Sequence, residues 1–251
     1  MQRNQGASKI RGHQSAREEM TNMQSLKEWA NTTGIPRSEK NDDVVSYTGE
    51  GESSSENLNE FLKAKGEGKK TNLKTWNGKR PEEAAKNISN GLKATTQDKD
   101  LYTGMGFNPS KIWESHKADV SKPVTIHSHA FISTSHLPQS TASFSADREG
   151  DGHDYTKHPL RNKNSVGAKF KGPINHILKI SVPKGTKASR ISHLSDFPEE
   201  NETLLDRGHK IEIHPHPEAK IITLGKFRGY HKLKTFVWHA KIVGHDPQNL
   251  D

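Results

Sequence analysis

The sequence predicts an α+β fold in which helices come first and strands follow. Segments before residue 98 have helical features, whereas those after it are mostly short runs of alternating polar and apolar residues. The 251 residues are enough to enclose a hydrophobic core, as one large domain or two small ones. We expect a disordered tail over residues 1–20 and a single domain over 21–251, with a helical part over 21–98 and a β-rich core over 99–251.

Three helices are expected in the first part of the chain. Residues 16–31 repeat apolar side chains at about three-residue spacing, which is typical of an amphipathic helix. Residues 54–65 form a second candidate, with serines available at its start as caps. Residues 81–92 form a third, in which Pro81 suits the first turn and two glutamates follow it.

Strand-like segments dominate from residue 99 onward. They are residues 101–103, 129–134, 176–182, 203–205, 210–213, 220–224 and 235–243. A turn at Asp206-Arg207-Gly208 is expected to join two of them. Residues 141–145 are expected to form a small-residue turn that carries Phe144.

The composition limits the classes of protein that the chain can belong to. Hydrophobic residues make up 29% and the mean hydropathy is -0.95, so residues 1–20, 63–79 and 145–172 are expected to be loop or disorder. Because there is no cysteine, disulfides and thiolate chemistry are excluded. The polar, basic first 24 residues argue against a secretory signal and a membrane span.

The charge balance favours acidic partners. The formal net charge is +8, which suits nucleic acid, an acidic protein or a dinucleotide with two phosphates, although solubility charge spread over the surface fits equally well. Only 6% of residues are aromatic and no basic stripe is interleaved with them, which argues against a stacking platform for single strands.

The fifteen histidines raise the question of a metal site. The segments His127-Ser128-His129 and His214-Pro215-His216 each place two imidazoles two residues apart. Zinc requires three or four convergent ligands, and no His-Glu-x-x-His pattern is present. We therefore expect no metal site.

Two carboxylates stand at alternate positions in Glu200-Asn201-Glu202, directly before the apolar segment Thr203-Leu204-Leu205. On an extended strand, such residues point to the same face, with Cα atoms about 6.5–7 Å apart. One acid can then stabilise a developing cation while the other acts on a nucleophile. A solvated strand face is the alternative interpretation.

Two further segments accompany this acidic pair. Residues 129–135 are a short apolar run that ends in Ser133-Thr134-Ser135, and residues 100–109 contain Tyr102-Thr103-Gly104. In this order, the three segments resemble the motifs of arginine-directed mono-ADP-ribosyltransferases, a family that includes clostridial-type binary toxins and enzymes of T4-like phages. The segments 47–62 and 177–185 also resemble parts of that family, so that the likeness covers about residues 44 to 245.

The resemblance implies a fold and an activity. The fold would be two packed antiparallel β-sheets with N-terminal helices and the cofactor in the cleft between the sheets. The activity would be transfer of ADP-ribose from NAD to an arginine of a host protein, with release of nicotinamide, by a phage- or toxin-derived enzyme. Location in a virion or in the host cytoplasm would fit the absence of an N-terminal apolar run.

The resemblance also assigns roles to the acids and to Ser133. Cleavage of the nicotinamide–ribose bond develops oxocarbenium character, and the cationic leaving group needs no general acid. Glu202 would hydrogen-bond the ribose 2′-hydroxyl, and Ser133 would hold the Glu202 rotamer. Glu200 would orient the target guanidinium and help to deprotonate it, because that group is otherwise almost always protonated.

Other residues would form the cofactor pocket. Thr134 and Ser135 would shape the part that holds nicotinamide and its ribose, and Gly104 would let the backbone approach the cofactor. Tyr102 would stack on adenine or fill the core. Phe144 would pack under nicotinamide or belong to the core.

One position departs from the family pattern. An arginine that grips the cofactor phosphates normally stands where this chain has Thr103. Arg148 and Arg161 are candidates to replace it, although both also fit as ordinary loop arginines. The departure leaves alternatives open: an impaired homologue that binds a partner or nucleic acid through its basic surface, a transferase for a non-arginine target, or an enzyme that only hydrolyses NAD.

Overall fold

The computed structural model describes residues 42–49, 54–107, 109–146, 175–195, 201–223 and 232–246. The tail expected over residues 1–20 and the helix expected over 16–31 lie outside these ranges. The observed fold is α+β, as the sequence predicts, and a large mixed sheet dominates it. None of the described helices is long and apolar enough to cross a membrane.

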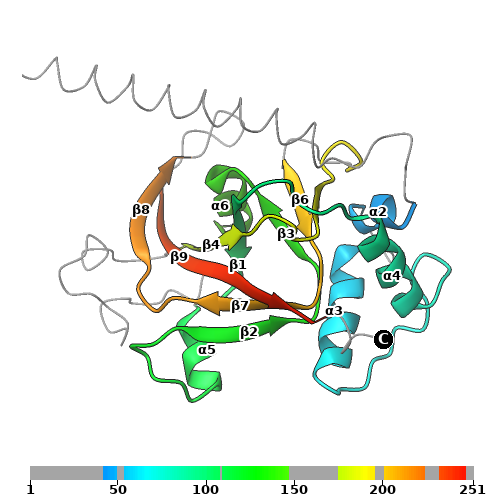
Figure 1. Cartoon of the computed structure of the whole chain (residues 1–251), viewed down its shortest axis with the longest axis horizontal. Helices are drawn as coiled ribbons and strands as arrows, with labels where there is room; N and C mark the ends of the chain where they lie inside the picture. The colour runs from blue at the N-terminus through cyan, green and yellow to red at the C-terminus, as the bar shows by residue number, and fades with distance from the viewer. Residues whose placement is uncertain are drawn as a thin grey trace, which may run out of the picture.

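Three helices lie together at one side of the sheet: α2 (Asp42–Tyr47), α3 (Ser55–Gly66) and α4 (Pro81–Gly91) (Figure 1). The last two confirm the helices expected over 54–65 and 81–92. Ser54 occupies the N-cap position of α3 without a side-chain capping bond, and Pro81 stands in the first turn of α4. Apolar residues of all three helices share one buried cluster with Ala130, Phe131, Ile191 and Leu204 from the β-rich part.

The sheet contains nine strands. They are β1 (Lys99–Met105), β2 (Val124–Ser128), β3 (Ile132–Ser135), β4 (Asn175–Val182), β5 (Ala188–Arg190), β6 (Glu202–Leu205), β7 (His209–Ile213), β8 (Glu218–Thr223) and β9 (Lys232–His245). Seven of them confirm expected strands. The sequence did not predict β2, whose apolar positions alternate with histidine and threonine, or β5, which has only three residues.

The strands form one continuous ladder in the order β2-β7-β9-β4-β1-β3-β6-β5, with β8 paired to β9. The expected pair of antiparallel sheets is therefore corrected in two respects, because the layers are joined and the β4–β9 pair is parallel. Strands from both ends of the ladder, including β2 and β5, bury residues in one core. The ladder thus bends around this core, and its two halves take the place of the two packed sheets.

Two short helices interrupt the β-rich part. Ile112 and Trp113 of α5 (Ser110–Ser115) join the core between the halves of the sheet. Residues 138–146 form α6 (Pro138–Ala146), so the turn expected over 141–145 is wrong. The small Ala142 is fully buried against Ile177 and Val237, and this tertiary contact selects helix where the local sequence is indifferent.

The segment expected to be loop or disorder over residues 63–79 is anchored at several points. Its first residues belong to α3, and Trp76 is buried, with its indole Nε1 donating to the Ser54 carbonyl at 3.0 Å. The buried Asp43 carboxylate accepts hydrogen bonds from Lys79 at 2.7 Å and from Asn77 at 3.1 Å. Residues 67–80 are therefore an irregular but fixed connection between α3 and α4.

Candidate active site

Residues of the three predicted motifs lie in one row across neighbouring strands. Tyr102 of β1 pairs with Ser135 of β3, and Ser135 pairs with Glu202 of β6. Directly paired residues of a β-ladder project from the same face of the sheet. The fold therefore brings together segments that stand far apart in the sequence, as the motif-based prediction requires.

A chain of hydrogen bonds connects Glu202 to the helical part. Ser133 bonds the Glu202 carboxyl and also the Tyr47 hydroxyl, and the Asn59 amide donates to the Tyr47 hydroxyl at 2.8 Å. Each hydroxyl carries one proton. With Glu202 ionised, Ser133 must donate to the carboxylate, so Tyr47 donates to Ser133 and accepts from Asn59. These hydrogen bonds thus fix the orientation of Glu202 through side chains from β3, α2 and α3.

The surroundings disfavour negative charge at this point. Burial raises the pKa of Glu202 and outweighs the opposing effect of its bond with Ser133. The pKa of Tyr47 is raised as well, first by burial and then by the nearby Glu202 charge. Tyr47 therefore keeps its proton and can donate a hydrogen bond. An ionised Glu202 is poorly solvated and would be stabilised by a cation.

The backbone directly before Glu202 differs from the expected extended strand. Strand β6 begins at Glu202, and Asn201 has a φ of 51°, in the left-handed region that asparagine tolerates better than most residues. The backbone between the two acids is therefore not extended at Asn201. Arg190 donates to the Asn201 side-chain oxygen at 3.4 Å, which helps to hold Asn201 in place.

The other hydroxyl residues of the Ser-Thr-Ser segment have structural contacts. Thr134 is buried and donates to the Thr203 carbonyl, on the opposite face of the ladder from Ser133 and Ser135. The Ser135 hydroxyl accepts from the Leu137 backbone N–H at 3.2 Å. Thr134 thus joins β3 to β6, and Ser135 fixes the start of the chain toward α6.

Strand β1 places its predicted residues on two faces. Tyr102 is half-buried and packs against the cluster of Ala142, Ile177 and Val237, a contact that fits one of its two predicted roles, the filling of the core. Thr103 pairs with Leu178, so its side chain leaves the opposite face of β1. Gly104 pairs with Ile177 in the same ladder.

Four predicted residues cannot be placed from the described part of the structure. Glu200, Arg148 and Arg161 lie outside the described residues. Phe144 belongs to the backbone of α6, but its side chain is outside the described part. Their predicted roles therefore stay predictions.

Tyr47 and Asn59 were not among the predicted site residues, although both stand in a segment that resembles the family. The sequence did offer a signal for Asn59. It lies one helical turn before Lys63 and two before Gly66, so the three residues share one face of α3. A side chain at Gly66 would collide with the His129 ring, so glycine lets α3 lie close to the segment before β3. This face of α3 therefore borders the site.

No group of three or more metal-ligating side chains occurs among the described residues. The rings of His127 and His129 lie edge to face at 5.2 Å, and His214 lies 3.8 Å from the Glu212 carboxylate.

The family model of the ADP-ribosyltransferase exoenzymes matches residues 19–235, which is most of the chain. The chain belongs to this family. No curated protein matches the sequence.

Several solved structures of ADP-ribosyltransferases are similar to this one. The toxin Plx2a of Paenibacillus larvae is 14% identical, with 91% of this chain and 96% of that chain covered and a TM-score of 0.47. The enterotoxin component BECa of C. perfringens, with NADH, is 18% identical, with 88% and 48% covered and a TM-score of 0.48. C3stau2 of S. aureus, with NAD, is 16% identical, with 85% and 94% covered and a TM-score of 0.44.

We predict that Glu202→Gln leaves this ADP-ribosyltransferase as stable as the wild type or more stable at neutral pH. A raised pKa means that folding disfavours the ionised carboxylate, so wild-type stability falls as pH rises through the folded pKa of Glu202. Glutamine avoids that loss of stability. The difference in stability between the variant and the wild type should vanish below the ordinary glutamate pKa of about 4.3. Melting temperatures of both proteins at several pH values measure the difference. Glu218→Gln is the control, because hydrogen bonding to Lys220 lowers the pKa of Glu218 and its loss should not stabilise the fold.

Proposed function

We propose that this ADP-ribosyltransferase uses NAD as its substrate and transfers ADP-ribose to an arginine side chain of a host protein, with release of nicotinamide. Membership of the exoenzyme family supports the transferase chemistry. The observation that carries the proposal is the half-buried Glu202, held by Ser133 at the end of the hydrogen-bond chain from α3. A partly buried carboxylate with a fixed orientation is suited to stabilise a cationic sugar.

In the proposed reaction, the bond between ribose C1′ and the nicotinamide nitrogen breaks, and its electron pair goes to the pyridinium ring. The ribose then has oxocarbenium character. Glu202 accepts a hydrogen bond from the 2′-hydroxyl and offsets the positive charge. A guanidinium nitrogen of the target forms the new bond to C1′ and loses a proton, which Glu200 accepts.

The arginine target rests on Glu200. A guanidinium attacks only when a nearby base helps to remove its proton. Glu200 stands two positions before Glu202, the first residue of β6, in the sequence. Without such a base, water would be the better acceptor and the protein would act mainly as an NAD hydrolase.

The cofactor phosphates need a positive group that Thr103 does not supply. Arg148 and Arg161 remain proposed for this role. Among the described residues, Lys63 is a further candidate, because it is exposed and lies on the same face of α3 as Asn59 and Gly66. Lysine would meet phosphate as a point charge, without the paired hydrogen bonds of arginine.

The central experiment incubates the protein with NAD labelled in its adenylate part and a cell lysate, and measures label on proteins and release of nicotinamide. We expect both activities in the wild type and a loss of about 100-fold or more in Glu202→Gln, the scale of losing an electrostatic stabiliser. Full activity of this variant would remove the assignment of Glu202. An inert wild-type protein that becomes active with Thr103→Arg would support the impaired homologue instead.

Glu200→Gln is expected to separate the two activities. Transfer to arginine should collapse while slow NAD hydrolysis survives, because water needs less help from a base than a guanidinium. Transfer to a small guanidine such as agmatine and nicotinamide release in water are the two rates to compare. If both rates fall together, Glu200 has a structural or cofactor-binding role and the arginine target loses its support.

Alanine at the cation that grips the phosphates is expected to raise the KM for NAD more than it lowers kcat, since phosphate binding is largely the same in ground and transition states. Lys63→Ala, Arg148→Ala and Arg161→Ala are compared by steady-state NAD hydrolysis, with Lys117→Ala as the control. A variant whose KM stays at the wild-type value is thereby excluded from this role.

A further inference from the structure

Positive charge is concentrated in one short segment of the chain. Residues 63–80 contain six lysines and one arginine but only one acidic residue, Glu67, which gives a formal charge of +6 in a chain whose net charge is +8. The segment covers the end of α3 and the fixed connection to α4. Most of the net charge is therefore gathered at one place in the fold.

The segment presents part of this charge to solvent. Lys65, Lys69 and Lys79 form ion pairs with Glu82, Glu67 and Asp43. Lys70, Lys74 and Arg80 are exposed and form no ion pair with any described carboxylate. Because Trp76 and the Asp43 hydrogen bonds anchor the connection, these three cations stand on a preformed surface, which we call the basic surface.

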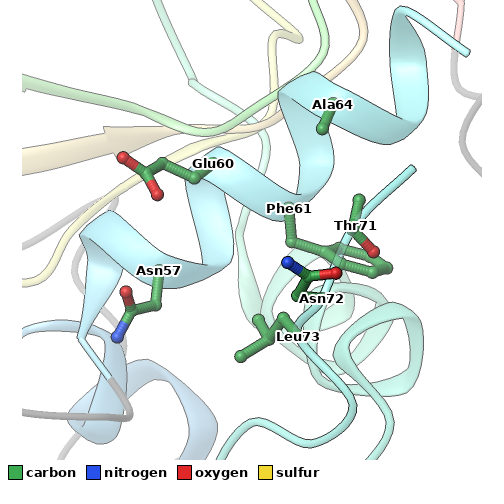
Figure 2. Close-up of a pocket in the computed structure, with 7 residues that line it drawn as sticks. All are labelled: Asn57, Glu60, Phe61, Ala64, Thr71, Asn72 and Leu73. Carbon is green, nitrogen blue, oxygen red and sulfur yellow. The ribbon is translucent and has the colours of Figure 1, made fainter. Parts of the chain in front are cut away.

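A pocket lies beside the basic surface, because residues 71–73, which line part of it, stand between Lys70 and Lys74 in the sequence. Figure 2 shows its walls: Asn57, Glu60, Phe61 and Ala64 from α3, and residues 71–73 from the connection that follows. Its volume is about 450 Å³. Apolar side chains, amide groups and one carboxylate line it together. It thus suits a side chain with an apolar stem and a hydrogen-bond donor at its tip.

The pocket and the candidate active site use different faces of α3. Asn57, Glu60 and Ala64 lie roughly 130° around the helix axis from Asn59, Lys63 and Gly66, at 100° per residue. A macromolecule bound at the pocket would therefore leave the face toward Ser133 and Glu202 accessible, although both faces belong to one helix.

We propose that the basic surface docks the protein substrate through an acidic patch of that substrate, and that the pocket receives one of its side chains. This inference rests on the proposed transfer of ADP-ribose to a protein. Long-range attraction between patches of opposite charge accelerates encounter and sets orientation. Docking at α3 would hold the acceptor beside the cofactor while the active-site face of the helix stays open.

Nucleic acid fits this surface less well. The aromatic side chains of the segment and pocket, Trp76 and Phe61, are 1% and 7% exposed, so they offer no platform for stacking bases. Glu60 lines the pocket and would repel a phosphate that entered it. An acidic protein can place its carboxylates near the exposed lysines and a neutral or donor side chain near Glu60.

The first test is binding, which does not depend on activity. Fluorescent poly-L-glutamate and oligothymidylate of matched length are titrated against the wild type, Lys70→Glu/Lys74→Glu, and the control Lys117→Glu/Lys122→Glu. The control reverses two exposed lysines in the segment that follows α5. We expect poly-L-glutamate affinity to fall about 10-fold or more in the first variant and less than about 2-fold in the control. Equal losses in both variants, or a loss for oligothymidylate alone, would overturn the proposal.

The second test compares three rates in the same proteins: NAD hydrolysis, transfer to agmatine and transfer to lysate proteins. Lys70→Glu/Lys74→Glu should lower only the transfer to proteins, by about 10-fold, because neither lysine belongs to the candidate active site. Ala64→Leu, which fills the pocket without a change in charge, should have the same selective effect. Unchanged transfer to proteins in these variants would refute the docking surface, whereas absence of all three rates in the wild type would refute the proposed function alone.

Discussion

The hydrogen-bond chain from Asn59 through Tyr47 and Ser133 to Glu202 is the interaction on which the site depends. It joins α3, α2, β3 and β6, so the position of Glu202 is set by helices as well as by its own strand. Packing also holds Tyr47 in this hydrogen-bond chain, because its buried ring contacts Phe131 edge to face at 5.6 Å. Any movement of the helices relative to the sheet would therefore change the orientation of Glu202.

This arrangement lowers the stability of the fold in order to place the negative charge of Glu202 in the candidate active site. Burial disfavours the ionised form of Glu202, and the fold does not place a described cation against it. A carboxylate without a resident counter-ion is free to interact with a positive sugar. The same helix that supplies Asn59 presents a basic surface on another face, so that α3 connects the chemistry to the proposed recognition of the substrate.

Much of the fold could be predicted from local sequence patterns, and the predictions that failed have identifiable physical causes. Alternating apolar residues predicted β4, β7 and β9, and capping and proline positions predicted α3 and α4. Residues 141–145 form part of a helix because Ala142 packs against the sheet, a contact that lies outside any local window. The single bent ladder depends on pairing between strands distant in sequence, which periodicity does not encode.

For the candidate site, the sequence by itself determined which residue types are present and in what order, and this sufficed to predict that Ser133 bonds Glu202. Only the tertiary structure decided that Tyr47 and Asn59 complete the chain, that Thr134 turns away from Ser133 and Ser135, and that Asn201 breaks the expected strand. The physical reason is that motif order carries the chemistry, whereas facing, burial and hydrogen-bond partners arise from register between strands and from the packing of helices against them.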